Sequence, residues 1–172
     1  YAHARIVSYD LSAALEVPGV VATFTGDDIG YDYIGPFVHD ETAIAKGKVR
    51  YIGEPVAAVA AIDQQTARRA VALIDIEYEE LPAVLSIDEA MADDAPLVHE
   101  NFEDLVRTYE ADHAPNVMSV MQVEEGDVDA AWAGCDVVIE GEYETQAQCH
   151  TYMEPCSALA DIDANGKFTV WS

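Results

Sequence analysis

The apolar run at residues 56–62 constrains the fold of this chain more than any other stretch of its sequence. An apolar run without alternation is typical of a strand covered on both faces, so we expect a central strand here. Asp63 follows and can cap a helix. The apolar face of that helix is expected to consist of Ala67, Ala70, Val71 and Ile74. Residues 74–78 then return as a strand, so this region predicts a sheet packed by a helix.

Shorter elements are expected on both sides of this region. Ser86 and Glu89 have the spacing of a capping box, which predicts a helix over the next few residues. The break Gly53-Glu54-Pro55 separates the central strand from an earlier one. The other elements expected in this part are strands over residues 1–9, 20–24 and 49–52, and a short helix over residues 11–16 with Asp10 as its cap and Pro18-Gly19 at its end.

Apolar periodicity fades between residues 93 and 115, a stretch that carries seven acids and two prolines. We therefore expect one domain over residues 1–105, a linker over 106–116 and a second structured part over 117–172. In the second part, alternation predicts strands at 117–123 and 137–145, the latter half-buried. A helix over 128–133 between Asp127 and Gly134, and a type I′ hairpin turn at Asn165-Gly166, are also expected. The predicted fold class is α+β, with a mixed sheet packed by helices and then an antiparallel strand set.

The charge balance excludes several classes of partner. The chain has 33 acids and 8 bases, a net charge of −25, so its surface repels phosphate, and we expect neither nucleic acid nor membrane binding. Such acidity suits either a halophilic source or an ordinary acidic protein, and both readings stay open. Three cysteines form no disulfide framework, and no leader or membrane-length apolar segment is visible, so a cytoplasmic location is expected.

The densest cluster of potential metal ligands is His150 and Glu154, with Cys149 and Cys156 nearby. A zinc site needs three or four converging ligands. Pro155 disfavours helical backbone at Glu154, which weakens a helical pairing of Glu154 with His150. We therefore favour a buried histidine satisfied by a local carboxylate, with two thiols in a core. A zinc site, or a place for His150 in the wall of a cofactor cavity, is the alternative.

The remaining candidate motifs have structural explanations. Residues 161–166 match the first half of a calcium loop, but Ser172 stands where a bidentate Glu is needed, and a hairpin explains the same residues. Acidic side chains that we expect to be solvated are Glu77, Glu79, Glu80, Asp93 and Asp94. Histidines with no visible orienting partner are His3, His39, His99 and His113. The residues alone therefore assign no catalytic, cofactor-binding or metal-binding position.

A series of short blocks nevertheless resembles a known family. The blocks are HARIV (3–7), PGVV (18–21), FTGDDI (24–29), IGP (34–36), HDE (39–41), VRYIGEPVAAV (49–59), ARRA (67–70) and IEYEELP (76–82). In this order they are similar to the α/β hammerhead domain of the xanthine dehydrogenase and aldehyde oxidase family, which carbon monoxide dehydrogenases share. Three later blocks resemble the opening of that family's molybdopterin-binding domain: GDVDAA (126–131), DVVIEGEY (136–143) and HTYMEP (150–155).

The resemblance implies a parent protein that is a molybdenum-dependent hydroxylase or dehydrogenase. It would oxidise a heterocycle or an aldehyde, with water as the oxygen source. Its partners would be the remainder of the molybdopterin-binding subunit together with iron–sulfur and FAD subunits or domains. In the family, the segments that contact the cofactor follow the position that corresponds to Ser172. We therefore expect this chain to be an inactive scaffold fragment without molybdopterin. The alternative is a free-standing acidic binding domain with no catalytic activity.

Overall fold

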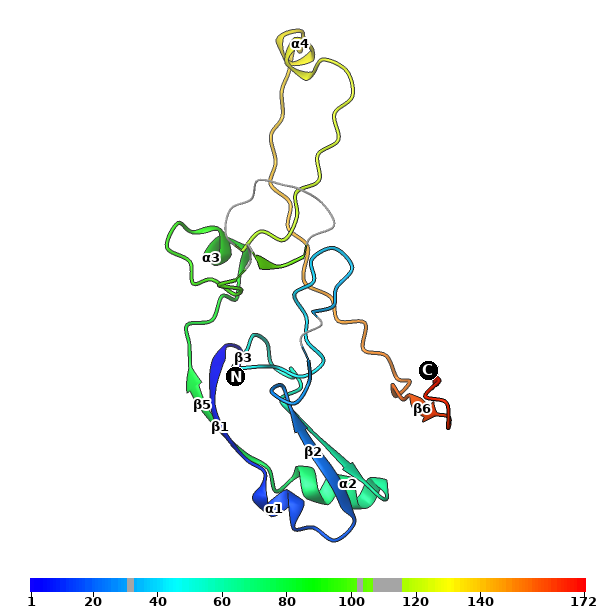
Figure 1. Ribbon diagram of the computed structural model, residues 1–172. Coiled ribbons are helices and arrows are strands. Elements are labelled where there is room, and N and C mark those ends of the chain that lie inside the picture. Colours follow the sequence, from blue (N-terminus) through cyan, green and yellow to red (C-terminus); the bar gives the residue numbers. More distant parts are fainter. Residues whose placement is uncertain (31–32, 102–103, 107–115) are drawn as a thin grey trace. The chain divides into compact units, whose positions relative to one another are not determined.

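The computed structural model describes residues 1–30, 33–101, 104–106 and 116–172. The chain forms two compact units, Tyr1–Val123 and Glu124–Ser172. Figure 1 shows the strands and helices of each unit. The strands form small sheets, and every pairing between named strands is antiparallel in the described part of the chain. The α+β class is confirmed, although the single mixed sheet expected from the sequence is replaced by separate antiparallel sheets.

The first sheet has the order β3-β1-β5 and carries one of the two buried clusters of the first unit. Its strands are β1 (Ala4–Asp10), β3 (Lys48–Val49) and β5 (Asp75–Glu80). Ala4 pairs with Val49 on one side of β1, and Ile6 pairs with Tyr78 on the other. The cluster consists of Ala4, Ile6, Ala45 and Val49. The sheet therefore holds the connection before β3 close to the first strand.

The second sheet pairs β2 (Val20–Thr25) with β4 (Ala57–Ala61), and no third strand joins it in the described part of the chain. The expectation of a central strand at 56–62 is wrong: every residue of β4 is half-buried, and Ile62 is 75% exposed. The reason is that helices cover only one face, where Val59 packs with a buried cluster of Ala14, Val17 and Ala70. Most residues of β4 are alanines, which have small side chains. Leaving one face of the strand in solvent therefore exposes little apolar surface and costs little free energy.

Two helices support this second sheet, α1 (Ser12–Leu15) and α2 (Gln64–Val71). Asp63 caps α2 as expected and accepts a hydrogen bond from Thr66 N at 2.7 Å. Hydrogen bonds from the backbone and side chain of Thr66 lower the pKa of the Asp63 carboxyl, and burial opposes them weakly. The expected apolar face is only partly correct, because Thr66 and Ala70 are buried whereas Val71 is 50% exposed.

Caps elsewhere follow local signals closely. The capping box before α3 (Ile87–Met91) is formed by Ser86 and Glu89, as the sequence predicts. At α1 the N-cap position is Leu11 rather than Asp10, but Asp10 still accepts from Ser12 N at 3.0 Å. None of the helices in the described ranges is long and apolar enough to cross a membrane.

The second unit contains one helix and one hairpin. The helix α4 (Val128–Ala133) is capped by Asp127 and ends at Gly134, as expected. The hairpin joins β6 (Leu159–Ile162) to β7 (Phe168–Trp171). Its turn is not type I′, which requires positive φ at two residues. Gly166 has a φ of 81° whereas Asn165 does not have a positive φ, and Gly166 N bonds Asp163 O at 2.9 Å.

The strands expected at residues 117–123 and 137–145 are not formed. Between residues 124 and 172 every side chain is exposed except that of Thr169, which is half-buried. Alternation along a strand sets its two faces, but a ladder of hydrogen bonds needs a neighbouring strand. In the described residues no neighbour pairs with either segment, so the expected half-buried strand at 137–145 is instead extended chain in solvent.

Candidate functional site

Two basic side chains of the first unit converge on the carbonyl oxygen of Val98. Lys48 Nζ donates to Val98 O at 2.9 Å, and Arg50 Nε donates to the same oxygen at 3.1 Å. Residues two apart on extended backbone point to the same side, which explains how both reach one acceptor. Lys48 is only 8% exposed, and its Nζ lies 2.7 Å from each carboxylate oxygen of Glu100. A buried ammonium group is therefore fully paired at this point.

The amide N–H of Val98 donates a hydrogen bond to Asn116, which lies 18 positions further along the chain. Val98 N donates to Asn116 Oδ1 at 2.9 Å, and Asn116 Nδ2 donates to Pro96 O at 3.0 Å and to Ala90 O at 3.4 Å. Asn116 has a φ of 66°, a left-handed conformation that asparagine tolerates better than most residues. We call Lys48, Arg50, Val98, His99 and Asn116 the Val98 clasp. It joins β3 and the residues after it to the segment that follows α3.

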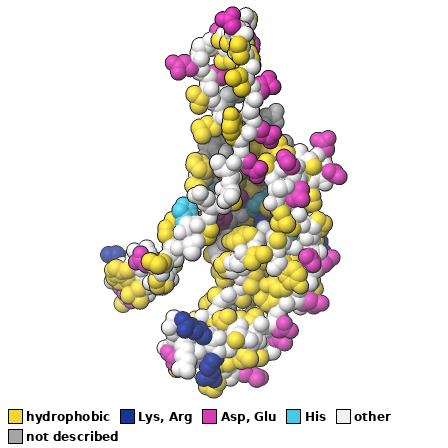
Figure 2. Space-filling view, turned by 180° about the vertical axis from the view of Figure 1, so that it is seen from behind, with side chains coloured by type: hydrophobic (Ala, Val, Ile, Leu, Met, Phe, Trp, Pro, Cys, Tyr) yellow, Lys and Arg dark blue, Asp and Glu magenta, His cyan; other side chains and the backbone are white. Residues whose placement is uncertain are grey.

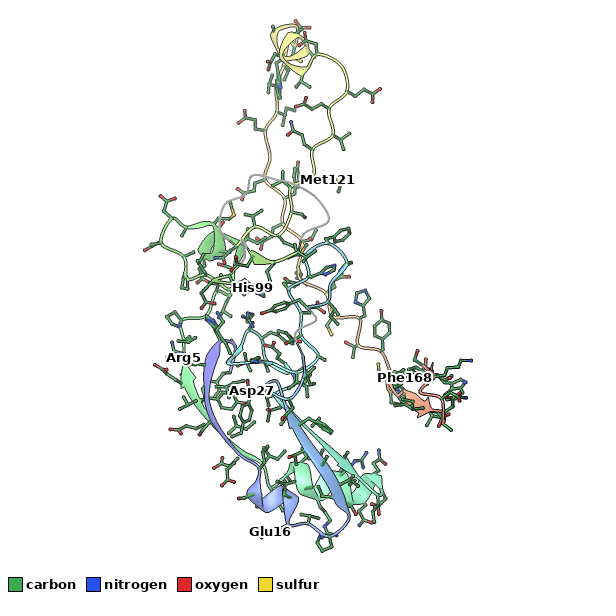
Figure 3. All side chains as sticks on the ribbon, in the orientation of Figure 1. Arg5, Glu16, Asp27, His99, Met121 and Phe168 are labelled. Atoms are coloured by element: carbon green, nitrogen blue, oxygen red, sulfur yellow. The ribbon has the colours of Figure 1, made fainter. Side chains whose placement is uncertain are left out.

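Two cavities adjoin the clasp and share part of their lining. The first, of about 250 Å³, is lined by Asp40, Glu41, Thr42, Arg50, Tyr51, Glu54, Val98 and His99. The second, of about 160 Å³, is lined by Asp40, Val98, His99, Asn116, Val117 and Met118. The residues common to both are Asp40, Val98 and His99. Figure 3 labels His99 at this place in the first unit. His99 thus lines both cavities.

The charges around His99 act on it in opposite directions. His99 Nε2 lies 3.6 Å from Asp40 Oδ2, which is longer than an ordinary hydrogen bond. Burial is the largest cause that lowers the pKa of His99, and the nearby charges of Arg50 and Lys48 lower it further. Asp40 and Glu100 raise it, but by less. The imidazole is consequently kept neutral to lower pH than an exposed histidine.

The structure changes the interpretation of the histidines. His99 was expected to lack an orienting partner, and it has Asp40 beside it. His3 also has one, because its Nδ1 lies 2.6 Å from Pro82 O, while its buried Nε2 has no hydrogen-bond partner among the residues that the structure describes. His39 contributes its backbone N–H to Val106 O at 2.9 Å, and His113 lies outside the described residues. The sequence signal for the clasp was the pair Lys48 and Arg50, spaced for one face of a strand in a chain with 8 basic residues.

The cluster predicted around His150 is not a core. Cys149, His150, Glu154 and Cys156 are all exposed, so the expected burial of the histidine and thiols is wrong. The segment is not helical, as Pro155 predicts, and the His150 ring stacks on Tyr152 with centroids 5.5 Å apart. Hydrogen bonding to Thr151 lowers the pKa of the Cys149 thiol. No three His, Cys, Asp or Glu side chains in the described ranges are placed to hold a metal ion.

The other acidic candidates serve structure or lie in solvent. Residues 161–166 form the end of β6 and its turn, where Asp163 Oδ1 accepts from Asn165 N at 2.8 Å and from Lys167 N at 2.9 Å. The acidic side chains of β5 are exposed as expected: Glu79 pairs with Arg5, and Glu77 accepts from Ser8 Oγ at 3.2 Å. Glu80, Asp93 and Asp94 are exposed as well.

Comparison with known proteins defines the class of the chain in two parts. Residues 1–82 match the family described as "Aldehyde oxidase and xanthine dehydrogenase, a/b hammerhead domain". Residues 109–172 match the family described as "Molybdopterin cofactor-binding domain". The two matches follow one another along the chain and together cover most of it. The chain belongs to the aldehyde oxidase and xanthine dehydrogenase family.

Individual relatives agree with this assignment. The chain is 36% identical over 169 residues to a nicotinate dehydrogenase large molybdopterin subunit of Eubacterium barkeri, covering 98% of this chain and 37% of the relative. It is 34% identical to a xanthine dehydrogenase of Dictyostelium discoideum, covering 96% of this chain and 11% of the relative. The aldehyde oxidoreductase structure from Desulfovibrio desulfuricans aligns with a TM-score of 0.78 and 27% identity, covering 99% of this chain and 19% of that one.

The family implies molybdopterin for the protein that contains this chain, so the described residues can be tested for a fit. Across 124–172 they offer no buried donor, because no side chain in that range is buried. They also bring no cluster of metal-binding side chains together. By themselves these residues do not form a cradle for the cofactor. The chain spans well under half the length of the curated relatives that it matches.

Proposed function

We propose that this chain is a scaffold part of a molybdenum-dependent hydroxylase or dehydrogenase that oxidises a heterocycle or an aldehyde with water as the oxygen source. The order of its two family matches supports this proposal. Molybdopterin, when bound, supplies the redox chemistry in such proteins, while the polypeptide supplies binding and orientation. The part taken by this chain is to build the hammerhead sheets and to lead into the cofactor-binding residues.

The exposed apolar side chains of the second unit carry the argument. Tyr143 is 93% exposed, Met153 is 99% exposed and Ile139 is 88% exposed. Figure 2 shows many hydrophobic side chains on the surface. Apolar side chains exposed this completely are stabilised when further protein packs over them, because their apolar surface is then removed from water. A free-standing acidic binding domain would be expected to bury these side chains within itself, so they favour the scaffold function over that alternative.

The proposal includes partners and a location. The surface of residues 124–172 would pack against the remainder of the molybdopterin-binding subunit. Iron–sulfur and FAD subunits or domains would accept the electrons that leave the cofactor. The net charge of −25 disfavours nucleic acid and anionic membranes as partners, and a cytoplasmic setting suits this assembly.

The complete protein encoded with this chain provides the test of chemistry. We expect it to contain molybdenum in stoichiometric amount by elemental analysis. With aldehydes and nitrogen heterocycles as substrates and an artificial electron acceptor, the product should take its new oxygen from ¹⁸O-labelled water. The chain of 172 residues alone should contain no molybdenum and show no activity. A complete protein without molybdenum, or an unlabelled product, would contradict the proposal.

A pair of substitutions tests the scaffold part separately. In the sequence, Ile139 and Glu140 fall on opposite sides of the alternating segment 137–145. If Ile139 packs against the remainder of the subunit, Ile139→Asp should lower the yield of assembled protein and its molybdenum content. Glu140→Gln should leave both unchanged, because its side chain would face solvent. Equal behaviour of the two variants would mean that this segment does not pack with its apolar side inward.

A further inference from the structure

We propose that the Val98 clasp is an acid-sensitive latch. When it is closed, it holds residues 96–101 and Asn116 against β3 and the residues after it. Protonation of His99 shifts the latch toward its open state. Nothing in the proposed oxidoreductase function requires such a device, and the latch does not depend on catalytic activity.

The first step of the argument is what a proton on His99 would meet. A protonated imidazole would be a third cation beside Lys48 and Arg50, both of which already donate to Val98 O. The ionisable groups that face the imidazole or line its cavity are Asp40, Glu41, Lys48, Arg50, Glu54 and Glu100. Tyr51 also lines the cavity, and burial together with Glu54 and Glu41 raises the pKa of its hydroxyl.

The second step is that two of the carboxylates near His99, those of Glu54 and Glu100, already accept hydrogen bonds from other groups. Glu100 binds Lys48 Nζ through both of its oxygens, and Glu54 Oε2 accepts from Arg50 N at 2.6 Å. Among the described carboxylates, Asp40 and Glu100 are the two whose charge raises the pKa of His99, and Asp40 Oδ2 lies 3.6 Å from His99 Nε2. Their charges do not offset the burial of the ring and the two neighbouring cations, since these together lower the pKa of His99.

The direction of the pH effect follows from this. In an open segment His99 protonates near the ordinary histidine pKa of about 6.5, whereas in the closed clasp it protonates only at lower pH. Between the two values the open state binds more protons than the closed state. The closed clasp therefore loses stability as pH falls below the ordinary value, and it is fully stable above that value.

The position of the clasp gives this opening a structural consequence. Lys48 and Arg50 belong to the hammerhead match, Val98 follows that match, and Asn116 belongs to the cofactor-binding match. Asn116 is also tied to the residues around α3 through Ala90 O and Pro96 O. An open clasp would release Asn116, which lies in the cofactor-binding match, from its hydrogen bond with Val98 N.

Hydrogen–deuterium exchange of the complete protein, corrected for intrinsic exchange rates, tests the latch directly. Between about pH 7.5 and pH 5.5 the opening equilibrium of residues 96–101 should rise by up to about tenfold, the limit for one histidine. His99→Gln cannot titrate, so its protection should not change with pH. His150→Gln, the same change at an exposed histidine, should behave like the parent. Lys48→Met provides a reference variant, in which residues 96–101 should be less protected than in the parent at both pH values.

Two outcomes would overturn the latch. One is a parent whose exchange in residues 96–101 does not change with pH. The other is a His99→Gln variant that keeps the pH dependence of the parent. If His99→Gln does not fold, exchange at the imidazole C2 position of the parent measures the pKa of His99 without any substitution. A value at or above about 6.5 would then exclude the latch, and a lower value supports it.

Discussion

Gly26 provides a sharp test of how the first unit packs. A Cβ atom placed on Gly26 would lie 2.3 Å from Ala45 O, 2.8 Å from Ala45 C and 2.9 Å from Lys46 Cα. All three are backbone atoms, and Ala45 is completely buried, with its N–H donating to Pro55 O at 2.7 Å. The backbone around Ala45 can therefore retreat only by breaking other contacts. We expect Gly26→Ala to lower the free energy of unfolding by about 1–3 kcal/mol, as overpacking does elsewhere.

Two other glycines separate the causes. Gly47 has a φ of +69° but open space around its Cβ position, so Gly47→Ala tests the backbone conformation alone. The expected loss is about 1–2 kcal/mol, the cost of the left-handed region for a residue with a Cβ. Gly30 has neither feature, since no atom of the described residues lies within 4 Å of its Cβ position and its φ is outside that region. Gly30→Ala should change the free energy of unfolding by less than about 0.5 kcal/mol.

Urea denaturation followed by circular dichroism, at one fixed salt concentration, measures the three variants against the parent. Thermal melting gives a second measure, because 1 kcal/mol corresponds to a shift of roughly 4–8 °C for a small domain. If Gly26→Ala were as stable as Gly30→Ala, the turn after β2 would not pack against Ala45, and the arrangement of this part of the unit would be wrong.

Three further predictions concern the core, the histidine cluster and the charge. Val59→Asp should abolish cooperative melting of the first unit, measured by circular dichroism, because Val59 packs on the buried Ala14 cluster. As a control, Ile62→Asp at a 75% exposed site should melt within a few degrees of the parent. Calorimetric titration with zinc should show no sub-micromolar site, and binding that His150→Ala abolishes would contradict this. Added salt should raise the melting temperature by screening the net charge of −25, and folding that requires molar salt would favour a halophilic source.

Features that are satisfied within a few residues could be predicted from the sequence. The Asp63 cap, the Ser86 and Glu89 capping box and the end of α4 at Gly134 all formed as expected. Each depends on a side chain or a backbone angle within one turn of the helix end. Asn165-Gly166 gave the correct hairpin but the wrong turn, because the loop contains one more residue than a type I′ turn allows.

Features that depend on distant residues were not predictable in the same way. The apolar run in β4 fixes a strand, but whether the strand is central depends on how many others join its sheet. Among the described residues, β2 alone joins it. In the Val98 clasp, Lys48 and Arg50 both bond to Val98. Val98 lies 50 positions after Lys48 and 48 positions after Arg50. Neither Val98 nor Asn116 has any local mark of the hydrogen bonds that it makes. The candidate cluster at His150 was dense in sequence and proved exposed in the fold.

The alternation in residues 137–145 is informative even though no strand forms there. Apolar side chains recur at Val137, Ile139 and Tyr143, whereas Glu140, Glu142 and Glu144 hold positions on the opposite face. A solvated extended segment gains nothing from separating apolar and charged side chains in this way, whereas a strand in a half-covered sheet does. The pattern thus predicts one face that packs against a neighbour, and Tyr143 on that face is 93% exposed. On this interpretation, Glu140, Glu142 and Glu144 would stay in solvent when a neighbour covers the apolar face. Part of the high negative charge would then lie on the surface and not in the core.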